Sequence, residues 1–322
     1  MHEMTALIDT LDIVVPAYKK QFLSNLLESL VAQTSQKFRV IVADDGSPEP
    51  LRTICEAYAY RLPLRYVRFE KNLGQSNLIG HWNRSVELSN AMWILLAGDD
   101  DLLEPECVAA FWRTSSDFGS RYDVFSLGIR VIDEYDRIIK EVLPANVDTP
   151  AEFLVDRFKG RIKPVPVGYI FSKAAFNRCG GFVPFDRGWH SDDASWALFS
   201  AATGIRPVDG AYARWRLSAV NITHAMSRNP VPAICASLDF VSWVLANRDR
   251  LGLAKRDSKR IIEAMNFWSW YPNLSEASTG KWFTNAWKAS SILRRYVGGS
   301  QLRHLYRFAQ YRMAASLRNS DT

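Results

Sequence analysis

The first hundred residues of this 322-residue chain alternate short apolar strands with amphipathic helices, and this pattern constrains the fold most. Strand patterns occupy residues 11–15, 38–43, 64–69 and 92–97, and helix patterns occupy residues 21–33, 49–60 and 75–89. Such alternation is typical of an α/β domain whose mainly parallel sheet carries helices on both faces. Ligands of these sheets bind beyond the carboxyl ends of the strands. The residues that directly follow each strand are therefore the first candidates for function.

After about residue 109 the signals are less regular, and a helical tail follows. We predict an antiparallel hairpin from residues 123–133 and 137–143, a strand at 167–172 and a helix at 191–203. The tail has helix patterns at 232–248, 256–268, 280–296 and 300–318. Because Asn229-Pro230 interrupts the chain before these helices, we expect a hinge there. The sequence thus predicts an α/β domain at 1–228, with halves 1–108 and 109–228, and a helical extension at 229–322.

Positive charge is concentrated in the helical extension. Residues 229–322 contain 14 Lys and Arg against 6 Asp and Glu, whereas the preceding residues contain 26 against 28. This imbalance indicates one surface that meets an anionic partner. The four dispersed cysteines form no CxxC pair, the start of the chain has no signal-peptide pattern, and no apolar run reaches membrane-spanning length. These features favour a cytoplasmic protein.

Acidic side chains follow two of the predicted strands and begin one predicted helix. They are Asp44-Asp45-Gly46-Ser47, Gly98-Asp99-Asp100-Asp101 and Ser191-Asp192-Asp193. Consecutive carboxylates repel one another unless a cation offsets their charge. Oxygen ligands suit a hard ion, Mg²⁺ or Mn²⁺, so the second cluster is a candidate metal site. The simpler interpretation is a solvated turn before a helix that begins near Pro105.

The other two acidic clusters also have two interpretations each. Asp44 and Asp45 could form an ordinary Asp-Gly turn, or accept hydrogen bonds from a nucleobase or a ribose. Asp192 and Asp193 could stabilise a helix N-terminus, where negative charge is favourable, or supply a general base.

Five segments resemble, in order and spacing, the motifs of the family 2 inverting glycosyltransferases with the GT-A fold. They read LDIVVPAYKK, VIVADDGSPEP, KNLGQSNLIGHWNRSVELS, WILLAGDDDLLEP, and GGFVPF followed by SDDASWAL. The resemblance covers about residues 11–224 and leaves the tail outside. It implies a GT-A fold, a Rossmann-like mainly parallel sheet, in an enzyme of the bacterial surface-polysaccharide type.

The resemblance also implies roles for individual residues. The nucleotide-sugar donor would be bound by Pro16, Ala17, Tyr18, Asp44, Asp45, Asn72, Gly74, Asn83 and Asp99. Asp100 and Asp101 would hold the metal, and which of them is the direct ligand stays open. Asp193 would be the general base with Asp192 as the alternative, because the first acid of this pair is Asp where the family more usually has Glu. Arg216 and His224 are candidates for contact with the diphosphate, and His224 is also a candidate metal ligand.

The implied reaction is inverting transfer of a sugar from a nucleotide-diphosphate sugar to a hydroxyl of a glycan or lipid-linked acceptor, with Mn²⁺ or Mg²⁺ as cofactor. It would belong to polysaccharide or O-antigen-type biosynthesis. A nicotinamide dehydrogenase needs a glycine-rich turn after its first strand, and this chain has VPAYKK there. A sugar-phosphate nucleotidyltransferase is disfavoured for the same reason. A non-catalytic relative that binds polysaccharide or a partner is the remaining alternative.

The basic tail permits a structural and a functional interpretation. Residues 281–318 contain eight Lys and Arg and no acid, with Trp282, Phe283 and Trp287 near their start. One predicted helix face carries Leu302, Leu305, Tyr306, Ala309 and Met313. These helices could pack on the catalytic domain with a solvated basic face. They could instead bind anionic lipid on the inner face of the plasma membrane. No nucleic-acid recognition motif accompanies the charge, so we expect no nucleic-acid partner.

Overall fold

The computed structural model describes residues 8–217, 231–265, 279–296 and 300–319. The chain divides into two compact units, of which the first comprises residues 1–150 and 161–218 and the second comprises 151–160 and 219–322. The sequence placed residues 151–160 in the α/β domain, whereas in the structure they belong with the helical second unit.

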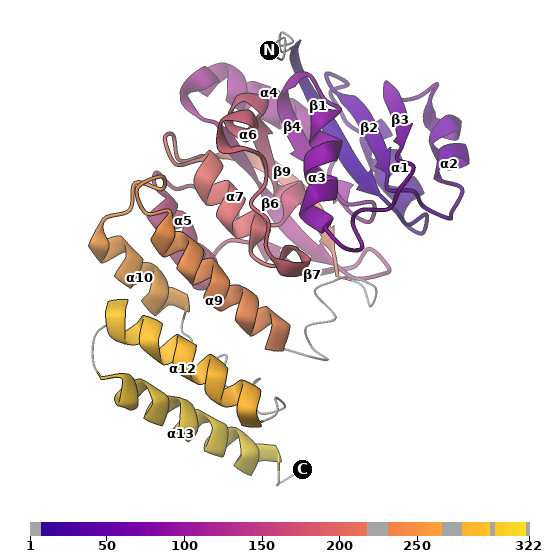
Figure 1. Ribbon diagram of the computed structural model, residues 1–322. Coiled ribbons are helices and arrows are strands. Elements are labelled where there is room, and N and C mark those ends of the chain that lie inside the picture. Colours follow the sequence, from indigo (N-terminus) through magenta and orange to yellow (C-terminus); the bar gives the residue numbers. More distant parts are fainter. Residues whose placement is uncertain (1–7, 218–230, 266–278, 297–299, 320–322) are drawn as a thin grey trace. The chain divides into compact units, whose positions relative to one another are not determined.

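The first half of the sheet is parallel and follows the predicted order of strands and helices (Figure 1). Its strands are β1 (Ile8–Ala17), β2 (Arg39–Asp44), β3 (Leu64–Arg68) and β4 (Ala91–Leu96), in the spatial order β3-β2-β1-β4. The connecting helices are α1 (Leu23–Val31), α2 (Leu51–Tyr58) and α3 (Leu78–Glu87). Ala17 pairs with Asp44, so β1 and β2 end at the same edge of the sheet. This register places the segments after both strands side by side.

The second half of the sheet is mixed. Its strands are β5 (Leu102–Leu103), β6 (Val124–Ile132), β7 (Ile138–Val142), β8 (Tyr169–Ser172) and β9 (Ile205–Arg216). The order continues β4-β8-β6-β9-β5, with β7 paired to β6 as the predicted antiparallel hairpin. The strand β9, which runs parallel to β6, was not predicted, because Asp209-Gly210 interrupts its apolar pattern. It ends at Arg216 and so brings that residue to the sheet.

Successive side chains of a strand point to opposite faces of the sheet, and in this sheet both faces are buried. In β1, Leu11, Ile13 and Val15 pack in one cluster with the apolar face of α1. Val14 is equally buried and lies outside that cluster. The mixed half carries α4 (Cys107–Phe118), α6 (Lys173–Cys179) and α7 (Ser191–Phe199), together with the short 3-10 helices η1 (Gly119–Arg121), η2 (Pro166–Gly168) and η3 (Asp186–Gly188).

Aromatic packing fixes α7, the helix that begins with the acidic pair. Trp196 and Phe199 are fully buried and contact Phe171 of β8, with ring centroids 5.5 Å away in both cases. The indole N–H of Trp196 donates to the Pro164 carbonyl at 2.9 Å. Because such buried aromatic contacts leave little room for a side chain to move, α7 is a rigid support for the residues at its N-terminus.

The second unit is helical, as predicted for the tail. It contains α5 (Pro150–Phe158), α9 (Val231–Ala246), α10 (Lys255–Met265), α12 (Thr279–Tyr296) and α13 (Gln301–Asn319), and the last four are orange to yellow in Figure 1. Phe158 of α5 contacts Phe240 of α9 at a centroid distance of 5.7 Å, which explains why α5 belongs to this unit. In the described ranges, no helix combines the length and the apolar character that crossing a membrane requires.

Candidate active site

A carboxylate from the segment after β4 holds the loop after β1. The backbone N–H groups of Tyr18 and Lys19 donate to Asp99 Oδ2 at 2.8 and 2.7 Å. The Ser47 hydroxyl, from the loop after β2, donates to the Tyr18 carbonyl at 2.6 Å. Burial raises the pKa of Asp99, while the two N–H donors stabilise its charged form. The segments after β1, β2 and β4 therefore meet at one edge of the sheet. The Asp99 carboxylate is occupied by the backbone of the loop after β1.

The three residues predicted to border the nucleotide base differ in exposure. Ala17 is the last residue of β1 and is fully buried, whereas Pro16 is half-buried. Tyr18 is exposed, and its backbone is fixed from both sides by the bonds to Asp99 and Ser47. Of the three, Tyr18 thus has the side chain that a ligand could reach.

Asp44 is a buried anchor at the end of β2. Its carboxylate accepts hydrogen bonds from the Ser47 N–H at 2.7 Å, from Arg68 Nη1 at 2.6 Å and from the Tyr66 hydroxyl. Burial, and next the hydrogen bond to Asp44, raise the pKa of Tyr66 to about 12. The phenol therefore stays protonated and keeps donating, so Asp44 fixes the turn at residues 44–47.

Asp45 joins the loop after β2 to the loop after β3. It accepts from the N–H groups of Leu73 and Gly74 at 3.0 and 2.8 Å and from Asn72 Nδ2 at 2.9 Å. The side chain is buried. The structure thus brings together Asp45, Asn72 and Gly74, which sequence reasoning had grouped at the nucleotide.

Two residues of α3, Arg84 and His81, complete this cluster and were missed in the sequence. Arg84 Nη2 donates to Asp45 Oδ1 and, at 3.0 Å, to the Lys71 carbonyl. Arg84 Nε donates to His81 Nδ1 at 3.2 Å, and burial lowers the pKa of His81 to about 4. The imidazole is therefore neutral near pH 7. The only signal in the sequence was their spacing of three on a predicted helix, which puts both side chains on one face.

Asn83, which was predicted to bind the nucleotide sugar, is hydrogen-bonded to the segment before α7. Its Oδ1 accepts from the Phe182 N–H at 2.8 Å. A Cβ at Gly181 would lie 2.8 Å from the same oxygen, so the close approach requires glycine there. Asn83 therefore connects α3 to the Gly-Gly turn that leads towards α7, whereas the sequence placed it at the nucleotide.

The segment after β4 packs its carboxylates around Gly98. The Gly98 N–H donates to Asp101 Oδ2 at 2.9 Å. A Cβ at Gly98 would lie 3.0 Å from both Asp101 Oδ2 and Asp100 Oδ1, so the two carboxylates lie close together. Burial, and next the charge of Asp99, raise the pKa of Asp100 to about 6. Burial and the charge of Asp100 raise the pKa of Asp101 well above its usual range.

These carboxylates have the properties expected of ligands for a hard divalent cation. Asp101 is buried, and its Oδ1 has no hydrogen-bond partner within the described part of the chain. A cation beside a carboxylate favours the charged form and so opposes the effect of burial. Among the described residues, no three His, Cys, Asp or Glu side chains are grouped as a complete metal site.

Arg216 is placed differently from the prediction that it contacts the diphosphate. Its guanidinium is fully buried at the end of β9, and Nε donates to the Asp100 carbonyl at 2.9 Å. The guanidinium carbon lies 4.1 Å from the centre of the Phe22 ring. These contacts fix the backbone of the acidic segment. His224, the other candidate, lies outside the described residues.

The acidic pair is at the N-terminus of α7, as predicted, and a histidine contacts it. Asp193 is buried, and its Oδ2 lies 2.6 Å from His190 Nδ1. Asp192 is half-buried, and its Oδ1 accepts from the Asp193 N–H at 2.8 Å. The spacing of three between His190 and Asp193 in the sequence was a usable signal of this contact.

The backbone before α7 is strained at non-glycine residues. Arg187 has φ +52° and His190 has φ +66°, in the left-handed region that such side chains rarely adopt. Strain of this kind costs about 1–3 kcal/mol per residue and tends to occur at functional sites. The Trp189 indole Nε1 between them is buried without a hydrogen-bond partner in the described ranges. This loop is therefore part of the candidate site.

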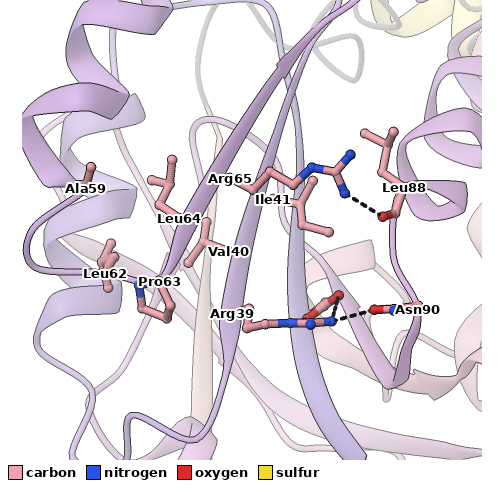
Figure 2. A pocket seen from close by; sticks show the side chains of 11 residues that line it. Arg39, Val40, Ile41, Ala59, Leu62, Pro63, Leu64, Arg65, Leu88 and Asn90 are labelled. Atoms are coloured by element: carbon pink, nitrogen blue, oxygen red, sulfur yellow. Dashed lines mark hydrogen bonds and ion pairs between the residues drawn. The ribbon is translucent and has the colours of Figure 1, made fainter. Parts of the chain in front are cut away.

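A pocket of about 320 Å³ lies at the other end of the parallel strands (Figure 2). It is lined by the first residues of β2 and β3, including Arg39 and Leu64. Arg39 forms hydrogen bonds of 2.7 and 2.8 Å to the buried Asp12, and one of 2.9 Å to Asn90. None of the predicted site residues lines this pocket. Its Arg39 is paired with Asp12, and its Arg65 donates to the Leu88 carbonyl at 3.2 Å.

The sequence matches a known family and several of its members. The sequence model of Glycosyl transferase family 2 matches residues 12–171. An uncharacterized glycosyltransferase of Haemophilus influenzae is 39% identical over 97 residues, which are 30% of this chain and 31% of that protein. A second one from the same organism is 26% identical over 169 residues, 50% of this chain and 59% of that protein. The matches thus span less than two thirds of these relatives.

Solved glycosyltransferase structures share the fold. S. aureus TarS 1–349 in complex with UDP-GlcNAc has a TM-score of 0.72 at 15% identity, covering 97% of this chain and 92% of that one. The mannosyltransferase PcManGT from Pyrobaculum calidifontis, in complex with GDP-Man and Mn²⁺, has a TM-score of 0.52 at 13% identity, covering 97% and 89%. The GT-A-like α/β fold expected from the sequence is confirmed. With these motifs, this sheet and these matches, the chain belongs to glycosyl transferase family 2.

Proposed function

We propose that this glycosyltransferase inverts the anomeric configuration as it moves a sugar from a nucleotide-diphosphate sugar to a hydroxyl of a glycan or lipid-linked acceptor. The acceptor would belong to polysaccharide or O-antigen-type biosynthesis. The observation that carries the proposal is the crowding of Asp100 and Asp101 at the sheet edge that also holds the loops after β1 and β2. TarS and PcManGT were solved with UDP-GlcNAc and GDP-Man, which supports a nucleotide-sugar donor here.

The donor would bind where the loops after β1, β2 and β3 meet. Tyr18 offers an exposed aromatic ring beside the nucleotide base. Asp45 holds Asn72 and Gly74 in place, so the loop after β3 is ordered before the donor arrives. Preordering of this kind lowers the entropy cost of binding.

Asp100 and Asp101 would hold Mn²⁺ or Mg²⁺. When bound, such a cation offsets negative charge on the nucleoside diphosphate. Mg²⁺ in nucleotide enzymes is commonly held by one or two carboxylates together with substrate phosphates. Two observations support this assignment. Asp101 Oδ1 has no hydrogen-bond partner among the described residues, and oxygens of both carboxylates lie 3.0 Å from where a Cβ on Gly98 would be.

Asp193, or Asp192 as the alternative, would remove the proton from the acceptor hydroxyl. The hydroxyl oxygen forms a bond to the anomeric carbon while the bond from that carbon to the diphosphate oxygen breaks on the opposite side. One base is sufficient, and the configuration inverts. His190 orients the Asp193 carboxylate through the 2.6 Å contact, and general bases of this kind contribute about 10²–10⁴-fold to the rate.

A donor screen tests the proposal against a non-catalytic binding role. Nucleoside diphosphate release is measured with Mn²⁺ for a panel of UDP-, GDP- and dTDP-sugars, with and without a lipid extract as the source of acceptor. We expect release from one donor, increased by the extract. Binding of a nucleotide sugar in calorimetry without turnover under any of these conditions would favour the binding protein.

We also propose that the second unit binds an anionic membrane surface, from which a lipid-linked acceptor is taken. Phe283 and Trp287 of α12 are 60% and 59% exposed, and Leu302 and Tyr306 of α13 are 74% and 62% exposed. The other sides of these helices are buried, at Ala286, Ala289, His304 and Phe308. Of the predicted apolar face, Leu305 and Ala309 are half-buried, and the Met313 side chain is outside the described part.

Cations accompany this apolar surface. The side chains of Arg294, Arg295, Arg303 and Arg307 are exposed, and the segment 281–318 contains no acid. Each basic residue near an anionic membrane contributes about 1 kcal/mol before screening. Exposed aromatic rings add burial at the headgroup level. The expected association is weak, reversible and sensitive to salt.

Flotation with liposomes tests the membrane proposal. The full chain should float with vesicles containing phosphatidylglycerol at low salt and should detach at high salt. The variant Arg303→Glu/Arg307→Glu should not float with the vesicles. The matched control Lys259→Glu/Arg260→Glu reverses two exposed cations on α10 and should float like the wild type. Equal flotation of both variants, or no flotation of the wild type at low salt, would contradict the proposal.

A further inference from the structure

One buried guanidinium contacts three separate segments of the first unit. Arg216 Nε donates to the Asp100 carbonyl and Nη1 donates to the Asp133 carbonyl, both at 2.9 Å. Nη2 forms an ion pair with Asp136 Oδ1 at 2.6 Å. The planar group also lies against the Phe22 ring, just before α1. Arg216 thus bonds the acidic segment after β4 to the turn of the β6–β7 hairpin.

The hairpin turn is itself an ordered support. The Asp133 carboxylate accepts from the N–H groups of Tyr135 and Arg137 at 2.8 and 3.0 Å, and from Arg137 Nε at 2.7 Å. Asp136 has φ +64°, which turns the chain back into β7. A turn held by its own hydrogen bonds presents the Asp133 carbonyl and the Asp136 carboxylate in fixed positions.

The acidic segment has a second, independent attachment. Asp99 is held by the backbone N–H groups of the loop after β1, as described above, and Asp100 is held through its carbonyl by Arg216. Neighbouring carboxylates repel and would move apart if their backbone were free. With both residues attached, the backbone cannot relax in this way, so the carboxylates of Asp100 and Asp101 stay close together.

We propose that Arg216 and Asp136 are positioning residues, which hold the Asp99–Asp101 segment in its cation-binding geometry through the hairpin turn. The inference rests on the proposed function only in naming a divalent cation as the ligand. Lysine cannot replace arginine here, because its one ammonium nitrogen would have to take over the contacts of three guanidinium nitrogens, to the Asp100 carbonyl, the Asp133 carbonyl and Asp136 Oδ1. Replacing partners in the outer shell of a metal site typically weakens metal affinity by about 10–100-fold.

The variants are Arg216→Lys and Asp136→Asn, with Arg137→Lys as the matched control. Arg137 is on the same turn, but its exposed guanidinium pairs with the Asp133 carboxylate. Within the described residues, it forms no hydrogen bond or ion pair with the acidic segment. The first measurement is hydrogen exchange of the amides at residues 98–103 without metal. We expect faster exchange in Arg216→Lys and Asp136→Asn, and wild-type exchange in Arg137→Lys. Unchanged exchange in both test variants would overturn the proposal whether or not the enzyme uses a metal.

The second measurement is Mn²⁺ binding, from the electron paramagnetic resonance signal of free Mn²⁺ titrated with protein and UDP, and separately with GDP. We expect affinity about tenfold lower in Arg216→Lys, and a smaller loss in Asp136→Asn. Wild-type affinity in both, with Mn²⁺ bound by the wild type, would overturn the link to cation binding. Absence of Mn²⁺ binding by the wild type would count against the proposed metal instead. If Arg216→Lys does not fold, both measurements are made on Asp136→Asn alone. The Asp136 side chain is 41% exposed, so this substitution should leave the fold intact.

Discussion

The Gly74 N–H donates to Asp45 Oδ2 at 2.8 Å, and a Cβ on Gly74 would lie at the same 2.8 Å from that oxygen. Real Cβ atoms essentially never approach another heavy atom so closely. The loop after β3 can therefore approach the Asp45 carboxylate only with glycine at this position. Asp45 receives further bonds from Asn72 and Leu73, so this contact decides the conformation of the whole loop.

Substitution Gly74→Ala should raise the KM for the nucleotide-sugar donor. The added methyl group forces the loop away from Asp45 and removes the prior ordering of the donor site. A loss of about 1.4 kcal/mol corresponds to a tenfold increase, and we expect a change of this order with a smaller change in kcat. The neighbouring Gln75→Ala, which alters an exposed side chain, is the control. Equal KM values for the two variants would show that the loop does not contact the donor.

Acidification should destabilise the first unit partly through His81. Its pKa is about 4 in the folded protein because the ring is buried, against an ordinary value near 6.5. At a pH between these two pKa values, His81 therefore binds a proton in the unfolded chain but not in the folded chain. The linkage stabilises the unfolded state as the pH falls from 6.5 towards 4.

The measurement is the free energy of unfolding in urea at pH 7.0, 6.0 and 5.0, for the wild type and His81→Gln. Glutamine can still accept the hydrogen bond from Arg84 Nε but does not titrate. We expect the wild type to lose more stability than the variant between pH 6 and pH 5. Parallel pH dependence of the two proteins would show that His81 does not titrate as its burial implies.

Much of the first unit and of the candidate site could be predicted from the sequence, because local patterns determine them. The apolar runs of β1, β2 and β4 identified a parallel sheet, and its strand ends were the first candidates for function. The family resemblance grouped Asp45 with Gly74 and Asp99 with Tyr18, and both pairs are hydrogen-bonded. These contacts follow from the general rule that parallel strands end at the same edge.

The residues that escaped prediction depend on tertiary partners. Arg216 has the charge of a diphosphate ligand, but β9 carries it inside, where carbonyls of two distant segments accept its hydrogen bonds. Asn83 is near the predicted site but bonds to Phe182, a residue 99 positions further along the chain. The α5 segment joins the second unit through Phe158, which no local pattern indicates.

Turnover should require a divalent cation, and Asp100→Ala should remove most of it. Beside Gly98, the buried carboxylate of Asp101 and the half-buried carboxylate of Asp100 lie close together, an arrangement that a cation stabilises. Nucleoside diphosphate release is measured after treatment with excess chelator and after readdition of Mn²⁺ or Mg²⁺. Turnover of Asp100→Asn and Asp101→Asn is also measured as a function of Mn²⁺ concentration. The variant that needs the larger increase in Mn²⁺ for half-maximal turnover has lost the direct ligand. Full turnover in excess chelator would remove the metal from the mechanism.

Substitution Asp193→Asn should leave donor binding unchanged and lower kcat by about 10²-fold or more, the scale of a lost general base. Asparagine is nearly isosteric, and its Oδ1 can accept a hydrogen bond from His190 Nδ1, so the N-terminus of α7 should keep its structure. Asp192→Asn is the matched comparison, because Asp192 is the neighbouring acid and is more exposed.

Donor binding is measured by calorimetry, and kcat is measured from nucleoside diphosphate release, for both variants. A large loss of kcat in Asp193→Asn with near-normal Asp192→Asn assigns the base to Asp193. The reverse result assigns it to Asp192 and makes the His190–Asp193 pair a support for the strained loop before α7. Near-normal turnover in both variants would exclude the acidic pair from proton transfer, and another group would have to accept the proton of the acceptor hydroxyl.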